Sequence, residues 1–197
     1  GGPVITMFRE DETPIPGSVG KPLPLTEIQI VDAKSGNEVL GSRKMGEIRV
    51  KGPQIMSGYR NRPQETSHTL RNGWLYTGDI GEYDKDGYFY IRGRKKDVII
   101  VSGFNVYPRE IDEVLYTHPA VIEVATVGIT DPYRGEVIHA YVALKNDLKT
   151  TVNELEQHCK NNLVNYKIPT KIIIVDQLPK TNVGKIDKVI LQKRSQE

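Results

Sequence analysis

The sequence predicts an α+β protein in two parts: a small β-rich barrel subdomain over residues 1–93, and a compact α+β domain over residues 94–197, in which helices flank a small mixed sheet. Glycine is the first observation behind this prediction, because 14 of the 18 glycines lie at or before Gly93 and frequent glycine favours turns. Periodicity is the second. Apolar and polar residues alternate in the first half, which is typical of strands, whereas helical spacing and a helix-capping pattern occur in the second half.

Three short strands are expected in the first part. Residues 27–32 and 47–51 alternate apolar and polar side chains, the pattern of half-buried strands. Residues 88–91 form a third apolar run, and residues 84–87 before it (Asp-Lys-Asp-Gly) are typical of a hairpin turn. Several short strands with frequent turns favour a small barrel or an open sheet.

The boundary between the two parts is expected at the charged stretch 93–97, which separates two strand-like runs. Residues 98–101 follow as an apolar run that predicts a buried strand. Pro108 suits the first turn of a helix, where its missing N–H costs no hydrogen bond, and the His118-Pro119 pair ends that helix.

The rest of the second part alternates strands and helices. Residues 121–129 and 137–144 are expected to be strands. Thr151 and Glu154 form a capping box, in which the two side chains bond free amide groups at the start of a helix. A strand at residues 171–175 and a basic helix complete a domain of about 100 residues, a common domain size.

Composition excludes several classes of protein. There are 27 Lys and Arg against 25 Asp and Glu, and a net charge of +2 is too balanced to predict a nucleic-acid partner. The longest aliphatic runs, residues 98–101 and 172–175, are far too short for a transmembrane helix. The single cysteine, Cys159, cannot form an internal disulfide, which fits a reducing compartment.

Three candidate ligand-binding motifs lack the residues or the spacing that binding would need. Residues 84–87 could open a calcium loop, but Tyr88 and Lys95 stand where an EF-hand needs oxygen ligands. Residues 179–186 contain Gly-Lys, but a phosphate-binding P-loop needs Gly at 179 and Ser or Thr at 186, and neither is present. The four histidines show no metal-ligand spacing, so no metal site is predicted.

The local sequence leaves the roles of two residues undecided. Lys185 follows Gly184 on a short loop and is either an ordinary surface lysine or a cation that reaches an external anion. Asp79 ends the stretch Leu-Tyr-Thr-Gly-Asp, which is interpreted as a tight turn. Its carboxylate either only ends a strand or accepts hydrogen bonds from two ribose hydroxyls, since an ionised carboxylate has two acceptor oxygens.

The order of these stretches resembles the C-terminal portion of the adenylate-forming enzyme superfamily, which includes acyl-CoA synthetases, adenylation domains and luciferases. Five stretches carry the resemblance, in the order and spacing of the superfamily: residues 46–52, 58–63, 73–79, 93–97 and 179–186. The likeness is strongest to bacterial long-chain fatty-acyl-CoA ligases, because of residues 72–79 and 94–108. Tyr76 and Gly93 depart from the His and Asp that many members have there.

The resemblance implies a two-step reaction. A fatty-acid carboxylate attacks the α-phosphate of MgATP to give an acyl-adenylate and pyrophosphate, and coenzyme A then displaces AMP. Lys185 is implied to be the catalytic residue that offsets the repulsion between the two anions of the first step. Asp79 and Arg94 are implied to bind the ribose of ATP and AMP.

The resemblance also implies a moving domain. Between the two steps the C-terminal domain rotates about a hinge, which maps to Lys96, so that Lys185 leaves the site. The strand that contains Ser102 and Gly103 is then implied to line the pantetheine tunnel, where glycine allows close backbone approach.

The resemblance further implies what this chain is within a complete enzyme. The phosphate loop and the acyl pocket of the superfamily have no counterpart here, so we expect a fragment that is inactive alone. ATP, Mg²⁺ and coenzyme A are expected to serve the full-length enzyme, and a cytoplasmic or peripheral inner-membrane location is compatible with the sequence. Another acid–CoA ligase, an acyl-AMP ligase and a non-catalytic module remain as alternatives.

Overall fold

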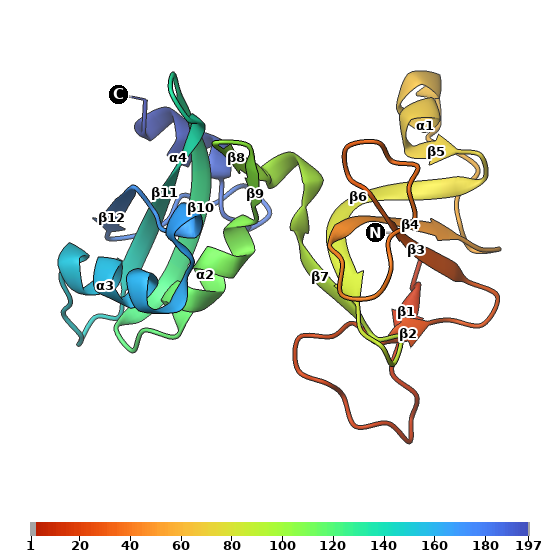
Figure 1. The fold of residues 1–197 in the computed structure, drawn as a ribbon, viewed down its shortest axis with the longest axis horizontal. Coiled ribbons are helices and arrows are strands. Elements are labelled where there is room, and N and C mark those ends of the chain that lie inside the picture. Colours follow the sequence, from red (N-terminus) through yellow and green to blue (C-terminus); the bar gives the residue numbers. More distant parts are fainter. Residues whose placement is uncertain (1–2, 197) are drawn as a thin grey trace. The chain divides into compact units, whose positions relative to one another are not determined.

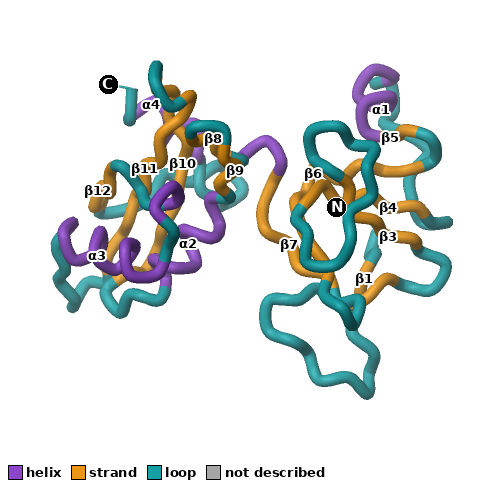
Figure 2. The backbone as a smooth tube through the Cα atoms, viewed as in Figure 1, coloured by secondary structure: helices purple, strands orange, loops and turns teal. Residues whose placement is uncertain are grey.

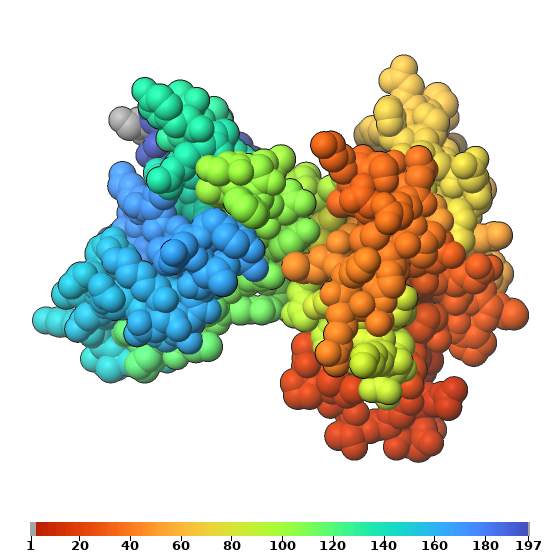
Figure 3. Space-filling model, in the orientation of Figure 1, coloured from red at the N-terminus to blue at the C-terminus, as the bar shows by residue number. Residues whose placement is uncertain are grey.

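The computed structural model describes residues 3–196, so the outermost ends of the two predicted parts, residues 1–2 and 197, lie outside it. The chain divides into two compact units, and the division falls between Lys96 and Asp97. The division lies within the charged stretch 93–97, three residues after the expected end of the first part at Gly93, because the last strand of the first unit continues to Arg94 and Lys95 pairs with Glu47 of the same unit. Figure 3 shows the first unit in red to yellow-green and the second in green to blue.

The first unit is built on a five-stranded antiparallel sheet. Its strands are β3 (Glu27–Val31), β4 (Gly46–Lys51), β5 (Leu70–Arg71), β6 (Trp74–Tyr83) and β7 (Phe89–Arg94). Strand β6 is the centre, since β4 pairs with one part of it and β5 and β7 pair with others. The long strand curves as it passes these partners, so the sheet curls into a half barrel (Figure 1).

Smaller elements complete the first unit. A two-stranded sheet and one short helix are added to the curled sheet: β1 (Thr6–Met7), β2 (Lys21–Pro22) and α1 (Pro63–Thr69). The core lies inside the curl and is made of four buried side chains from three strands: Ile30, Ile48, Val50 and Phe89. The strands expected at 27–32, 47–51 and 88–91 are thus confirmed, each to within a few residues.

The second unit contains a mixed five-stranded sheet with three α-helices. A 3-10 turn, η1 (Lys95–Asp97), spans the division between the units. The elements that follow it are β8 (Ile99–Val101), β9 (Phe104–Val106), α2 (Pro108–Tyr116), β10 (Val121–Asp131), β11 (Gly135–Leu144), α3 (Val152–Asn162), the 3-10 turn η2 (Asn165–Lys167), β12 (Lys171–Val175) and α4 (Lys188–Arg194). Figure 2 shows these helices around the strands of the unit.

Strand β11 is the centre of this sheet. Strand β10 pairs antiparallel along one side of it, while β12 pairs parallel and β8 antiparallel along the other. Helices α2 and α3 pack on one face through Ile111, Leu115, Leu155 and Cys159. Helix α4 covers the other face through Leu191, next to Leu178 from the loop before it. The α+β class with a small mixed sheet flanked by helices is therefore confirmed.

Two expectations about this unit need correction. Residues 98–101 do not form a fully buried strand, because Ile100 is 51% exposed and β8 alternates between core and solvent. Ser102 and Gly103 do not lie on a strand either, since β8 ends at Val101 and β9 returns from Phe104. The capping box at Thr151 and Glu154 is present as expected.

Candidate functional site

Asp79 lies at a bulge in the middle of β6, and not at the tight turn expected from the sequence. The pairing of β6 with β4 shifts register between Glu47 and Arg49, so β6 carries extra residues at this point. Gly78 absorbs the bulge with a φ of +70°, a left-handed conformation that glycine adopts without strain. The strand then continues to Tyr83, because both sides of the bulge remain paired.

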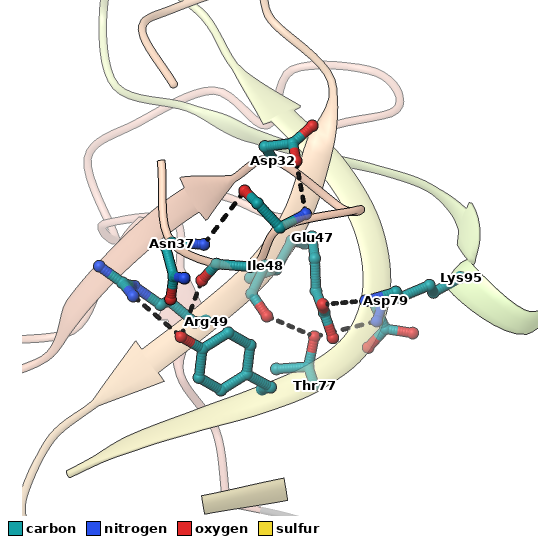
Figure 4. A network of polar contacts seen from close by, with 11 residues as sticks. Asp32, Asn37, Glu47, Ile48, Arg49, Thr77, Asp79 and Lys95 are labelled. Carbon is teal, nitrogen blue, oxygen red and sulfur yellow. Dashed lines mark hydrogen bonds and ion pairs between the residues drawn. The ribbon is translucent and has the colours of Figure 1, made fainter. Parts of the chain in front are cut away.

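The side chain of Thr77 fixes this bulge. Its hydroxyl donates to the carbonyl of Ile48 on β4 (2.9 Å) and accepts from the backbone N–H of Asp79 (3.0 Å). Figure 4 shows Thr77 between these two groups. Asp79 also lines a cavity of about 130 Å³ whose other walls are mainly apolar. The bulge therefore places Asp79 in the wall of a mainly apolar cavity.

Arg94 is brought directly opposite Asp79. The two residues are register partners on β7 and β6, and Nη1 of Arg94 lies 2.6 Å from Oδ1 of Asp79. The side chain of Arg94 is 53% exposed and that of Asp79 is 27% exposed, so both reach solvent. An ionised carboxylate has acceptor capacity on both oxygens, which leaves Asp79 able to accept hydroxyl donors beside the bond to Arg94.

A second ion pair next to this site was missed by the sequence analysis. Glu47 on β4 is 3% exposed, although strict alternation would place it on the polar face with Arg49. Nζ of Lys95 lies 2.8 Å from Oε2 of Glu47 (Figure 4). A buried carboxylate needs such a partner, because an unpaired charge in a core is costly. Local sequence carries no signal for this pair, since 48 positions separate the two residues.

Lys185 lies on a small hairpin before α4. Lys180 and Ile186 pair across it, and the N–H of Thr181 donates to the carbonyl of Lys185 (2.7 Å). Gly184 turns the chain with a φ of +78°. The side chain of Lys185 is exposed, so its ammonium can meet an anion supplied from outside this unit.

Ser102 and Gly103 form the two-residue turn between β8 and β9. Both have positive φ, +49° and +86°, which is the geometry of a primed hairpin turn. The N–H of Ser102 donates to the carbonyl of Arg134 (2.8 Å), so this turn is fixed to the loop between β10 and β11. An added Cβ on Gly103 would meet nothing within 4 Å among the described residues.

The structure thus brings the predicted site residues together only in part. Asp79 and Arg94 form one group with Glu47 and Lys95 in the first unit. Lys185, Ser102 and Gly103 lie in the second unit, on separate loops. Cys159 has no catalytic geometry, because it lies on the buried face of α3 and burial raises the pKa of its thiol to about 11. No helix among residues 3–196 has the length and apolar character needed to cross a membrane.

Comparison with known proteins decides the family. The family described as "AMP-binding enzyme" matches residues 1–60, and the family described as "AMP-binding enzyme C-terminal domain" matches residues 110–185. A long-chain-fatty-acid–CoA ligase from Bacillus subtilis (strain 168) is 48% identical over 171 residues, which cover 87% of this chain. The chain belongs to the adenylate-forming, AMP-binding enzyme family. The resemblance drawn from the five sequence stretches is confirmed.

Other members of the family differ in the acid that they are named for. A 2-succinylbenzoate–CoA ligase from Geobacillus sp. (strain WCH70) is 44% identical over 170 residues, or 86% of this chain. Among solved structures, ATP-bound MatB from Rhodopseudomonas palustris matches with a TM-score of 0.91 at 34% identity, over 98% of this chain and 38% of that one. The chain spans 30% of the Bacillus subtilis ligase and 34% of the Geobacillus ligase, about a third of each.

Proposed function

We propose that the complete protein is an ATP-dependent long-chain fatty-acid–CoA ligase, which forms an acyl-adenylate and then an acyl-CoA thioester. The observation that carries the proposal is the combination of a carboxylate–guanidinium pair, Asp79 and Arg94, with an exposed lysine on a hairpin, Lys185, in a chain of this family. The 48% identity to a long-chain-fatty-acid–CoA ligase supports the choice of acid.

Lys185 serves the first step. The attacking carboxylate and the α-phosphate of ATP are both anions, so the barrier to their reaction is largely electrostatic and positional. An ammonium between them lowers this barrier, and Mg²⁺ enters bound to ATP as part of the substrate. The exposed position of Lys185, on a hairpin that is ordered by its own backbone bonds, supports this role.

Asp79 and Arg94 bind the ribose of the nucleotide in this proposal. In this role the carboxylate of Asp79 accepts hydrogen bonds from the ribose hydroxyls, while Arg94 holds the carboxylate in place and supplies further donors. The direct ion pair and the shared exposure of both side chains to solvent support it.

Lys96 serves as the hinge between the two steps. Residues up to Lys95 are held to the first unit by β7 and by Glu47, and the second unit begins at Asp97. A rotation between the units can therefore use the backbone of Lys96 and would change only the 3-10 turn η1 that contains it. In the rotated state the turn at Ser102 and Gly103 lines the path of the pantetheine arm of coenzyme A.

Half-reaction kinetics on the complete protein test this proposal. Lys185→Ala should slow ATP–pyrophosphate exchange by about 100- to 1,000-fold, the effect of losing one preorganised electrostatic donor. Thioester formation from supplied acyl-adenylate should change little, since Lys185 has left the site in that step. Lys193→Ala, an exposed lysine on α4, is the matched control. Equal losses in both half-reactions would refute the assignment.

A panel of acids tests the substrate. The runner-up is another acid–CoA ligase or an acyl-AMP ligase, and the 44% identity to a 2-succinylbenzoate–CoA ligase is the observation in its favour. Saturated fatty acids of 8 to 18 carbons, roughly the span of medium to long chains, should be activated faster than aryl or short-chain acids if burial of each CH₂ contributes about 0.8 kcal/mol. A preference for an aryl acid would favour the alternative that the protein is another acid–CoA ligase or an acyl-AMP ligase.

The 197-residue chain alone is proposed to be inactive, and the complete protein to act in the cytoplasm or at the inner face of the membrane. A non-catalytic module is the alternative for the chain alone. Formation of acyl-CoA by the purified chain would contradict the proposal of inactivity, whereas sedimentation of the complete protein with anionic vesicles would separate the two locations.

A further inference from the structure

The outer edge of β10 is covered by polar side chains from two helices. Among the strands of the second unit β10 pairs only with β11, so the backbone groups along its other side need different partners. Four side chains supply them: Tyr116 Oη accepts from Val124 N–H (3.3 Å), Asp112 Oδ1 accepts from Thr126 N–H (2.9 Å), Lys188 Nζ donates to Thr126 O (3.1 Å), and Gln192 Nε2 donates to Gly128 O (3.2 Å). In each helix the two residues are four positions apart and so share one face.

Two of these four side chains belong to α4, the helix that follows the hairpin of Lys185. Lys188 is the first residue of α4, and the side chain of Asp187 caps that helix. The chain from Lys185 to Lys188 is short, so the place of the hairpin is set by where Lys188 and Gln192 bind β10.

The first strand of the hairpin makes a separate contact with β10. Nζ of Lys180 lies 2.8 Å from Oε1 of Glu123 on β10, with the two side chains 49% and 33% exposed. An exposed pair of this kind contributes little to stability, but it limits where the strand can lie. Both arms of the hairpin are therefore attached to the same strand, β10, while residues 182–185 between them are exposed.

Asp112 adds a charge to this arrangement. Burial raises the pKa of Asp112 to about 6, and the neighbouring Lys188 ammonium opposes that rise while Glu113 adds to it. The carboxylate of Asp112 and the ammonium of Lys188 thus bind the two backbone groups of the same residue, Thr126, from α2 and α4. Thr126 itself is fully buried, so both contacts end at the core.

We propose that Lys188 and Gln192 are positioning residues for Lys185. They fix α4 to the edge of β10 and thereby hold the hairpin in one geometry for the adenylation step, while Asp112 binds Thr126 on the same edge from α2. The inference rests on the proposed function for its kinetic part. A misplacement of about 1 Å in a reacting group costs on the order of 100-fold in rate, which is why an exposed hairpin needs such ties. Leu178 and Leu191 still anchor the same segment in the core, so variants of Lys188 and Gln192 should fold.

Hydrogen exchange and half-reaction kinetics on the complete protein test the proposal together. The amides of Thr181, Gly184 and Asp187 are bonded across the hairpin and its base, and their exchange reports its order. Lys188→Met and Gln192→Glu should each speed this exchange by about tenfold, the effect of losing one hydrogen bond. They should slow adenylation by about 10- to 100-fold and leave thioester formation from supplied acyl-adenylate within about twofold. Lys188→Arg should restore both, and Lys193→Met is the matched control.

The outcomes separate this inference from the proposed function. Unchanged exchange in both variants overturns the positioning role, whatever the activity. Faster exchange with unchanged adenylation overturns it as well, because the order of the hairpin would then not serve the lysine. Failure of the proposed function has a different signature: Lys185→Ala itself would leave adenylation intact, while exchange in the Lys188 and Gln192 variants still reports on the ties.

Discussion

The ion pair between Glu47 and Lys95 makes an asymmetric prediction. Glu47 is the buried partner, with 4% of its side chain exposed, whereas the side chain of Lys95 is 41% exposed. Lys95→Met removes the ammonium and leaves a buried carboxylate with no countercharge. Glu47→Gln removes the charge from the core, and the ammonium of Lys95 can turn to water. The lysine variant should therefore destabilise the first unit more than the glutamate variant does.

The magnitudes follow from the burial of each partner. Breaking a fully buried pair costs about 3–5 kcal/mol when a charge is left behind. Water reaches Lys95 and with it one side of the pair, so we expect about 2–3 kcal/mol for Lys95→Met after discounting for solvent. Glu47→Gln loses a hydrogen bond to a charged group but can keep a weaker amide contact, and about 1 kcal/mol is expected.

Trp74 provides the assay. It is the single tryptophan of the chain and lies on β6, so its fluorescence during urea unfolding reports on the first unit. Lys85→Met, an exposed lysine in the β6–β7 turn, controls for loss of a surface charge and should change the free energy of unfolding by less than about 0.5 kcal/mol. If Glu47→Gln costs as much as Lys95→Met, the reasoning from asymmetric burial is wrong.

Four further predictions concern single residues. Burial raises the pKa of Asp112 from 3.8 to about 6, so the folded state holds this proton more tightly than the unfolded state. The free energy of unfolding should then fall as pH rises from about 4 to about 6, by at most about 3 kcal/mol, and urea titrations of Asp112→Asn should lack that fall. Gly103→Asn adds a side chain that tolerates the φ of +86°, so a raised KM for coenzyme A would reflect the tunnel and not backbone strain; an unchanged KM would remove Gly103 from it. Lys96→Pro should spare ATP–pyrophosphate exchange and block thioester formation, because proline fixes φ at the hinge, and normal overall turnover would count against that role. Asp79→Asn should raise the KM for ATP by about tenfold or more through loss of a charged acceptor, which initial-rate titrations would detect.

Most elements of the fold could be predicted from local sequence. The alternation in residues 27–32 and 47–51, the proline at position 108 and the capping box at Thr151 each act within a few residues of chain, and each element is present. The course of β6 could not be predicted in this way. Gly78 was interpreted as a turn, but pairing with β4 on one side and β7 on the other carries the strand through it as a bulge.

The candidate site, like the fold, could be predicted from the sequence only in part. Asp79, Arg94, Lys96, Ser102, Gly103 and Lys185 could be named from the order of motifs in the chain. The partners that hold some of them could not. Glu47 stands at an alternating position that predicts exposure, and the fold buries it beside Lys95, whose ammonium at 2.8 Å offsets the cost of the buried charge.

The sequence by itself determined the class of the fold, the order of its elements, the family and the residues proposed for the site, because these depend on local patterns and on motif order. Only the tertiary structure decided which polar groups meet: Arg94 with Asp79, Lys95 with Glu47, and the side chains of α2 and α4 with the edge of β10. The physical reason is that these contacts join segments up to 64 positions apart. Their existence depends on strand register and helix docking, which no local pattern in the chain records.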